Sequence, residues 1–415
     1  MGIDAAAVHA LRSETLDWRF KAIPGDAAGA TVAEFLAGAP TLDRLGTPLL
    51  TLDAAALTHN IDLMARWTED AGLTLAPHGK TTMAPALWQR QLDAGAYGIS
   101  LANLPQLRVA RAFGVQRLML AGSLLDPAGL AWVGAELDAD PRFSFLSWVD
   151  SAASVRLMDA ALRAAGTVRP VEVCVELGAP GGRTGARDLR EALEVGAAVR
   201  AAPTLRLAGT AGYEGALAHD ASPESLDTVD AYLARLADLH DRLDHETTDP
   251  VLTAGGSAYF DRVAAVLGHL PTRVVLRSGA YVVHDDGFYR AISPFSRGVG
   301  KEPLRSAMYG FARVISRPEP GLALLDAGKR DLPFDEGLPE PHSVCGRGAG
   351  PVRGAAVTAV NDQHAFLSLA PGSDLAHGDV VRLGLSHPCT ALDKWSLIPV
   401  VDGERVVDLV RTFFS

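Results

Sequence analysis

Residues 73–82 read Leu-Thr-Leu-Ala-Pro-His-Gly-Lys-Thr-Thr, a short apolar run that ends shortly before a lysine, Lys80. Similar short runs recur along the chain, and the segments between them carry apolar residues three or four positions apart. This alternation of strand-like and helix-like segments predicts a parallel β/α architecture. The runs lie at 48–53, 73–77, 97–102, 117–122, 143–150, 171–178, 205–213, 251–256 and 273–279.

A (β/α)₈ barrel of the TIM type needs eight strands, whereas the sequence offers nine runs. We therefore expect the first run, 48–53, to lie outside the barrel. From Met308 onward, β-prone segments separated by Gly, Pro and Asp turns predict an antiparallel β domain. Pro and Gly are dense over 327–354, which predicts a long loop there. The expected domains are a helical N-terminal extension over 1–46 (one helix and a linker), a barrel over 47–300 and a C-terminal β domain over 301–415.

Composition narrows the class of protein. Hydrophobic residues make up 48% of the 415 residues and charged residues 21%, a balance that supports large buried cores and excludes general disorder. The net charge of −11 argues against a nucleic acid or an acidic membrane surface as a partner. Three cysteines, no signal-peptide pattern and no long apolar stretch lead us to expect a cytoplasmic protein.

Lys80 is the first residue that suggests chemistry. A lysine at the carboxyl end of a barrel strand faces the barrel mouth, where such proteins place their active sites. Its amine would there be a nucleophile for an aldehyde, and pyridoxal phosphate, held as a Schiff base, is the aldehyde cofactor that fits. Taken alone, a solvated loop lysine is the simpler interpretation. The two glycine-containing loops that follow the last two runs favour the cofactor.

Those two loops are Thr-Ala-Gly255-Gly256-Ser257 and Arg-Ser278-Gly279-Ala-Tyr281. With the first run outside the barrel, they follow barrel strands seven and eight, the usual place for a phosphate in this architecture. The glycines would let backbone N–H groups approach phosphate oxygens, and a helix expected to start at Ser257 would present its positive end. By itself, Gly-Gly more often means only a tight turn.

A third motif lies in the expected β domain, where Ser-His387-Pro-Cys389-Thr reads His-x-Cys. Two residues apart on an extended chain, the imidazole and the thiol face the same side and could share a zinc ion. Two ligands are few for a structural zinc but leave room for water and substrate on a catalytic one. A buried cysteine beside a surface histidine is the simpler alternative. Three other histidines could take part: His284, His342 and His364.

Together these motifs make the chain, over roughly 47–415, resemble the D-serine dehydratase and D-threonine aldolase family. The resemblance implies pyridoxal-phosphate enzymes of the alanine racemase fold (fold type III), in which the first strand joins the β domain. The extra N-terminal residues resemble a D-amino-acid deaminase subgroup. The family usually reads Arg-Pro-His-x-Lys-Thr-His-Lys, whereas this chain has Ala76 before Pro77 and Thr82-Met83 after Thr81.

The resemblance also implies roles for single residues. Lys80 matches the Schiff-base lysine and general base, Arg183 an arginine on the ring oxygen, Tyr213 a tyrosine near the cofactor, and His387 and Cys389 the metal ligands. The expected cofactor-binding residues are Lys80, His78, Arg183, Tyr213, Gly255, Gly256, Ser257, Ser278, Gly279 and Tyr281. Family members are homodimers in which the β domain of one subunit reaches the barrel mouth of the other.

The metal pair separates two reactions. By resemblance, His-x-Cys with zinc marks dehydratases and His-x-Asp with a harder ion marks aldolases, consistent with the softness of a thiolate. Cys389 therefore favours dehydration of D-serine or another D-3-hydroxy amino acid to a 2-oxo acid and ammonia. A D-threonine aldolase, a racemase with a second base, and a non-catalytic pyridoxal-phosphate-binding protein remain alternatives.

Overall fold

The computed structural model describes residues 2–347, 350 and 352–414. Its larger part is a parallel eight-stranded sheet in the order β2-β9-β8-β7-β6-β5-β4-β3. Backbone hydrogen bonds from Tyr97 to Leu75 (2.7 Å) and from Ser100 to Pro77 (2.9 Å) join the two edge strands, so the sheet curls into a barrel. The strands are β2 Thr74–Leu75, β3 Ile99–Leu101, β4 Arg117–Leu120, β5 Ser144–Val149, β6 Val171–Leu177, β7 Leu205–Gly212, β8 Val251–Ala254 and β9 Arg273–Leu276.

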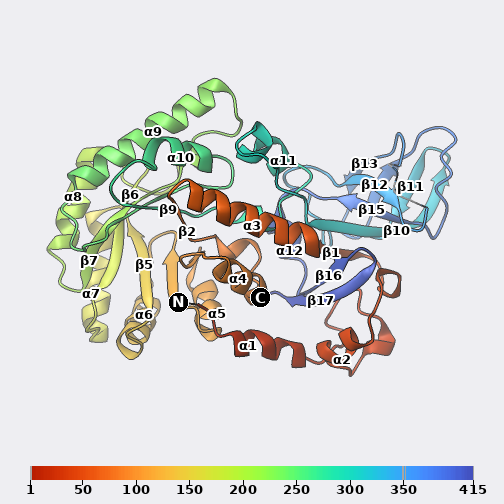
Figure 1. Cartoon of the computed structure of the whole chain (residues 1–415), viewed down its shortest axis with the longest axis horizontal. Helices are drawn as coiled ribbons and strands as arrows, with labels where there is room; N and C mark the ends of the chain where they lie inside the picture. Colours follow the sequence, from red (N-terminus) through yellow and green to blue (C-terminus); the bar gives the residue numbers. More distant parts are fainter. Residues whose placement is uncertain (1, 348–349, 351, 415) are drawn as a thin grey trace.

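Helices surround this barrel on its outer face (Figure 1). Short polar side chains start several of them by accepting backbone N–H groups of the first turn, as Asp53 and Ser151 do. Their buried faces carry apolar residues at helical spacing, which is why the alternating sequence pattern predicts them. The helices are α3 Ala54–Asp70, α4 Pro85–Asp93, α5 Leu104–Ala112, α6 Pro127–Ala139, α7 Ala152–Ala165, α8 Leu189–Arg200, α9 Pro223–Arg242, α10 Phe260–Leu267 and α11 Phe288–Ile292.

A second sheet forms the other part of the molecule, to the right in Figure 1. The first apolar run, β1 Leu49–Asp53, belongs to it, as the count of nine runs predicts: β1 pairs antiparallel with β10 and parallel with β16. All other pairs are antiparallel, and β12 lies inside the region expected to be loop. The remaining elements are β10 Met308–Glu319, β11 Leu322–Leu325, β12 Glu340–Val344, β13 Ala356–Val360, β14 Ala365–Ser368, β15 Val380–Gly384, β16 Leu397–Asp402, β17 Arg405–Arg411 and the helix α12 Pro388–Leu392.

The N-terminal segment is not one helix with a linker, as expected, but two short helices, α1 Ala5–Ala10 and α2 Val32–Ala37, with 3₁₀ turns between and after them. It begins against the barrel, where Asp4 N–H donates to Phe113 O, and ends on β17, where Thr41 bridges Arg405. Figure 1 shows it running along one side of both parts. Within the described residues, no helix is long and apolar enough to cross a lipid bilayer.

Candidate active site

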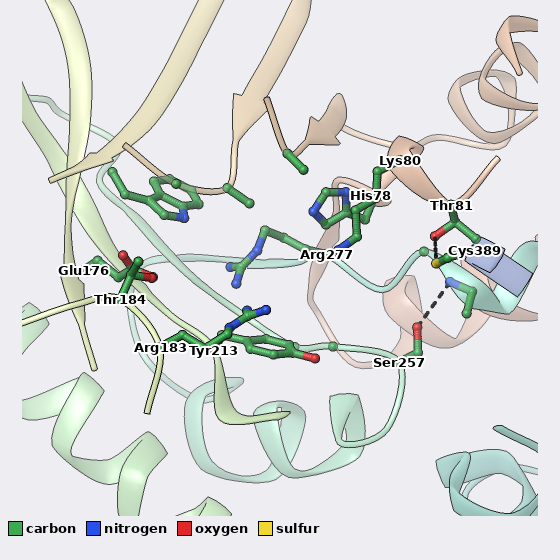
Figure 2. A pocket seen from close by; sticks show the side chains of 18 of the residues that line it. His78, Lys80, Thr81, Glu176, Arg183, Thr184, Tyr213, Ser257, Arg277 and Cys389 are labelled. Carbon is green, nitrogen blue, oxygen red and sulfur yellow. Dashed lines mark hydrogen bonds between the residues drawn. The ribbon is translucent and has the colours of Figure 1, made fainter. Parts of the chain in front are cut away.

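A cavity of about 470 Å³ opens at the carboxyl ends of the barrel strands. Residues of the barrel line most of it, and His387 and Cys389 of the β15–α12 turn also line it, with Cys389 next to Thr81 (Figure 2). Ten of the predicted site residues line this one cavity: His78, Lys80, Arg183, Tyr213, Gly255, Gly256, Ser257, Gly279, His387 and Cys389.

Lys80 lies on a 3₁₀ turn, η4 Gly79–Thr81, directly after the first barrel strand. The turn packs tightly, since a Cβ on Gly79 would come within 2.8 Å of the Trp88 indole nitrogen. His78 precedes it and is half-buried; desolvation and then the charge of Lys80 hold the pKa of its imidazole well below the usual value. Its Nδ1 has no hydrogen-bond partner among the described residues. The neutral His78 ring therefore lines the cavity beside Lys80 (Figure 2), with its unpartnered Nδ1 buried.

The Gly255-Gly256 loop differs from the sequence prediction in two ways. Its two backbone N–H groups do not point to a phosphate site, because the buried carboxylate of Glu214 accepts both, at 3.0 and 2.6 Å. The helix expected to start at Ser257 begins at Phe260, three residues later. Glu214 thus anchors the loop, and Gly255 adopts a left-handed conformation with φ of 93°.

The donors that remain for an anion come from Ser257 and Gly279. Neither backbone N–H donates to another described residue, and both residues line the cavity. The hydroxyl of Ser257 accepts a hydrogen bond from Ala280 N–H (3.2 Å), so its own proton is free to donate. A Cβ on Gly279 would lie 2.6 Å from His78 O, so only glycine lets this loop approach the Lys80 turn. These groups fit a phosphate.

Arg183 and Tyr213 stack on one side of the cavity, with the guanidinium 4.5 Å from the centre of the ring. Burial raises the pKa of the Tyr213 phenol, which keeps it protonated. A flat aromatic cofactor in this cavity would therefore contact the Arg183 cation, the neutral Tyr213 phenol and the neutral His78 ring.

Two expected residues do not line the cavity. Ser278 is buried, and its hydroxyl donates to the carbonyls of Gly255 and Gly256, so it stabilises the Gly255-Gly256 loop. Tyr281 is also buried, and its hydroxyl accepts from the Gln91 amide at 2.8 Å. The structure thus turns Tyr281 away from the place where a cofactor ring would lie.

Sequence reasoning missed two charged residues at the closed end of the cavity. Arg277 is buried and donates to Gly212 O (2.7 Å). Glu176 is 8% exposed; Thr184 donates to its Oε1 (2.9 Å), while Oε2 has no partner among the described residues. Burial raises the pKa of the Glu176 carboxyl. Their positions just after or near the ends of barrel strands are the signal that could have found both.

His387 and Cys389 come to the cavity from the second sheet. His387 has a left-handed backbone, with φ of 48°, and its N–H donates to the buried Asp285 carboxylate at 3.0 Å. Its Nδ1 lies 2.5 Å from Asp335 Oδ2. Cys389 Sγ lies 3.6 Å from Thr81 Oγ1, next to Lys80 in sequence (Figure 2).

The two metal-ligand candidates influence each other. Burial alone would raise the pKa of the Cys389 thiol, but its interactions with His387, Thr81 and Lys80 outweigh burial and lower that pKa. The same contact with Cys389, followed by Asp335, raises the pKa of His387 to about 9. An imidazole beside a readily ionised thiol is a donor pair that fits zinc.

A third protein ligand does not join this pair. Within the described residues, no group of three or more His, Cys, Asp or Glu side chains is arranged to hold a metal ion. His284 is buried outside the cavity lining, His342 lies 4.0 Å from Asp286, and His364 is exposed.

Comparison with known proteins places this site in context. The family model "Alanine racemase, N-terminal domain" matches residues 52–274, more than half of the chain, and the model "Putative serine dehydratase domain" matches residues 307–401.

Three relatives illustrate the similarity. A D-threonine aldolase from Arthrobacter sp. is 29% identical over 83% of this chain and 86% of its own length. A D-threo-3-hydroxyaspartate dehydratase from Delftia sp. (strain HT23) is 27% identical over 84% of this chain and 92% of its own. The crystal structure of a D-threonine aldolase from Filomicrobium marinum is 26% identical, with a TM-score of 0.76 over 90% of this chain and 97% of that one. The barrel, the second sheet and these matches together show that the chain belongs to the alanine racemase N-terminal domain family and is related to D-threonine aldolase and D-3-hydroxyaspartate dehydratase.

Proposed function

We propose that the protein is a pyridoxal-phosphate- and zinc-dependent lyase. Its reaction would be removal of water from D-serine or another D-3-hydroxy amino acid, and hydrolysis of the released enamine would then yield a 2-oxo acid and ammonia. The observation that carries the proposal is that Lys80 and the His387–Cys389 pair, more than 300 positions apart in sequence, line one cavity. A nucleophilic amine can hold the cofactor, and a soft metal-ligand pair can hold an ion that activates the leaving hydroxyl.

The cavity residues divide into those that would hold the cofactor and those that would act on the substrate. Ser257 and Gly279 offer donors for the phosphate, Lys80 the amine for the aldehyde, and Arg183, Tyr213 and His78 surround the space for the ring. Bound pyridoxal phosphate would supply an electron-withdrawing ring that makes the α-hydrogen of an attached amino acid acidic. Lys80 would take that proton as general base.

The His387–Cys389 pair would act on the β-hydroxyl. His387 and Cys389 would hold zinc, and zinc would supply the Lewis acid that turns the hydroxyl into a better leaving group. Two protein ligands leave coordination positions for water and for the substrate oxygen. Because Cys389 lies beside the turn that carries Lys80, one face of a small amino acid can meet both groups.

Retro-aldol cleavage is the second candidate, because the 29% identical relative is a D-threonine aldolase. That reaction would use the same cavity but would remove the hydroxyl proton and break the Cα–Cβ bond. A product assay separates the two: the purified protein with pyridoxal phosphate and zinc is incubated with D-serine and with D-threonine. We expect ammonia and 2-oxo acid in equal amounts. Glycine with an aldehyde as the main products would establish the aldolase instead.

We further propose that the protein works as a homodimer in the cytoplasm, with the partner subunit near the cavity mouth. Large exposed apolar side chains support this, since Phe334 and Leu338 flank Asp335, and Leu125 follows the cavity-lining Gly122 closely in sequence. Such side chains commonly mark protein interfaces. Light scattering on the purified protein should give twice the mass of one chain.

A further inference from the structure

The loop before β12 places an acidic side chain against the metal-ligand pair. Asp335 Oδ2 lies 2.5 Å from His387 Nδ1, and Asp335 Oδ1 accepts a hydrogen bond from Thr390 Oγ1 at 2.7 Å. Both carboxylate oxygens are therefore used, one on the imidazole and one on the residue after Cys389. The sequence pattern around 327–354 predicts only a loop, and Asp335 belongs to none of the Lys80, glycine-loop and His-x-Cys motifs.

The loop is fixed on both sides of Asp335. Four residues earlier, the carbonyl of Asp331 accepts from the Trp395 indole at 2.9 Å, and the Asp331 carboxylate pairs with Lys21 of the N-terminal segment at 2.9 Å. One residue later, Glu336 O accepts from Ser386 Oγ at 2.7 Å, directly before His387. The position of Asp335 is thus set by contacts with several parts of the fold.

We propose that Asp335 is a positioning residue for His387. A carboxylate on Nδ1 selects the tautomer that carries its proton on Nδ1, so the lone pair is left on Nε2. It also fixes the orientation of the imidazole ring. The backbone of His387 is itself held in the left-handed conformation. Metal-ligating histidines commonly have such a partner on the second nitrogen, and its loss typically weakens metal binding 10- to 100-fold. Nε2 of His387 is then the nitrogen that binds the ion.

The inference rests on the proposed zinc at His387 and Cys389, and its test measures metal binding rather than turnover. Zinc affinity is determined by competition with a coloured chelator for the wild type and for Asp335→Ala, both loaded with pyridoxal phosphate. We expect the dissociation constant to rise roughly 10- to 100-fold in the variant. The cofactor absorbance and the melting temperature of the metal-free protein should stay at the wild-type values.

Two further variants make the result specific. Asp335→Asn keeps an oxygen that can accept from Nδ1–H, so it should recover most of the affinity. Glu336→Ala, on the same loop but without a side-chain hydrogen bond to the metal turn, should bind zinc like the wild type. Equal losses in Asp335→Asn and Asp335→Ala would instead make Asp335 a direct ligand. Wild-type affinity in Asp335→Ala would overturn the positioning role, whereas a wild type that binds no zinc would refute the proposed function itself.

Discussion

Cys389 Sγ lies 3.6 Å from Thr81 Oγ1, so the thiol of the second sheet meets the barrel one residue away from Lys80. This contact joins two segments that lie 308 positions apart in the chain. It means that the active-site candidates form a single unit: a metal on Cys389 and a cofactor on Lys80 would act on neighbouring atoms of one substrate.

Lys80 should be the attachment point of the cofactor. After incubation with pyridoxal phosphate, the wild type should be yellow, and borohydride followed by peptide mass analysis should find the cofactor on Lys80. Lys80→Ala should stay colourless after dialysis and lose activity at least about 1,000-fold, because it lacks both the nucleophile and the base. Lys301→Ala, an exposed lysine outside the cavity, serves as the control. A yellow Lys80→Ala protein with its cofactor on another lysine would disprove the assignment.

Cys389 should be needed for the metal but not for the cofactor. Chelation of the wild type and the substitution Cys389→Ala should each abolish ammonia release from D-serine while leaving the protein yellow. Added zinc should restore ammonia release in the chelated wild type but not in Cys389→Ala. Cys345→Ala, which removes an exposed cysteine outside the cavity lining, should leave activity and colour unchanged. Full dehydration activity in both the chelated enzyme and Cys389→Ala would rule out zinc as the Lewis acid and favour a metal-free reaction such as racemisation.

The softness of the Cys389 ligand should determine which ion is used. A thiolate favours zinc, whereas a carboxylate suits manganese or magnesium. Cys389→Asp should therefore bind zinc more weakly than the wild type and gain relative affinity for manganese. Reconstitution of the metal-free proteins with each ion, followed by binding measurements, checks this. An unchanged preference for zinc would mean that residue 389 is not a ligand.

Glu214 should hold the cofactor loop in place. Its carboxylate accepts the backbone N–H groups of Gly255 and Gly256, and it is fully buried. Glu214→Gln turns one acceptor into a donor that faces an N–H group, which costs about 1–3 kcal/mol for an unsatisfied buried group. That loss corresponds to a roughly 5- to 150-fold weaker binding of pyridoxal phosphate. Equilibrium dialysis measures it, with Glu224→Gln on the exposed side of α9 as the control. Unchanged affinity would show that the loop does not depend on Glu214.

The parts of this architecture that follow local rules could be predicted from the sequence. Nine apolar runs against a barrel of eight strands place 48–53 in the second sheet, and β1 pairs there with β10 and β16. Lys80 and the glycines of the two loops reach the cavity for a related reason, because each of these motifs follows a strand of the barrel.

What could not be predicted depends on contacts between distant segments. A pair of glycines indicates accessible N–H groups, but nothing nearby in sequence shows that Glu214 would occupy them. Asp335 lies in a stretch whose Pro and Gly content predicts only a loop, and its role follows from the 2.5 Å contact with His387. Tyr281 follows Gly279 closely, yet burial against Gln91 turns its hydroxyl away. Hydrogen bonds of this kind leave no periodic pattern in the sequence.

The stability of the protein should fall in acid partly because of His240, a buried histidine at the base of the barrel. Its Nδ1 and Nε2 lie 2.6 and 3.0 Å from the hydroxyls of Thr210 and Thr272. Burial, and then the neighbouring His245, lowers the pKa of His240 from 6.5 to about 4. Between these two pH values the unfolded chain binds more protons at this residue than the folded one does. The contribution of neutral His240 is therefore complete above about pH 6.5 and is lost as the pH falls through about 4.

A pKa difference of about two and a half units corresponds to a contribution of at most about 3 kcal/mol to the free energy of unfolding. Urea unfolding of the wild type and of His240→Gln, measured from pH 7 to pH 4, checks the size and the sign of this contribution to stability. The variant cannot titrate, so its free energy of unfolding should fall less steeply on acidification than that of the wild type. His284, whose pKa burial also lowers to about 4, is present in both proteins and cancels in the difference. His9→Gln removes an exposed histidine and should follow the wild-type curve. Parallel curves for the wild type and His240→Gln would mean that His240 is already accessible to protons in the folded protein, against the burial that the structure shows.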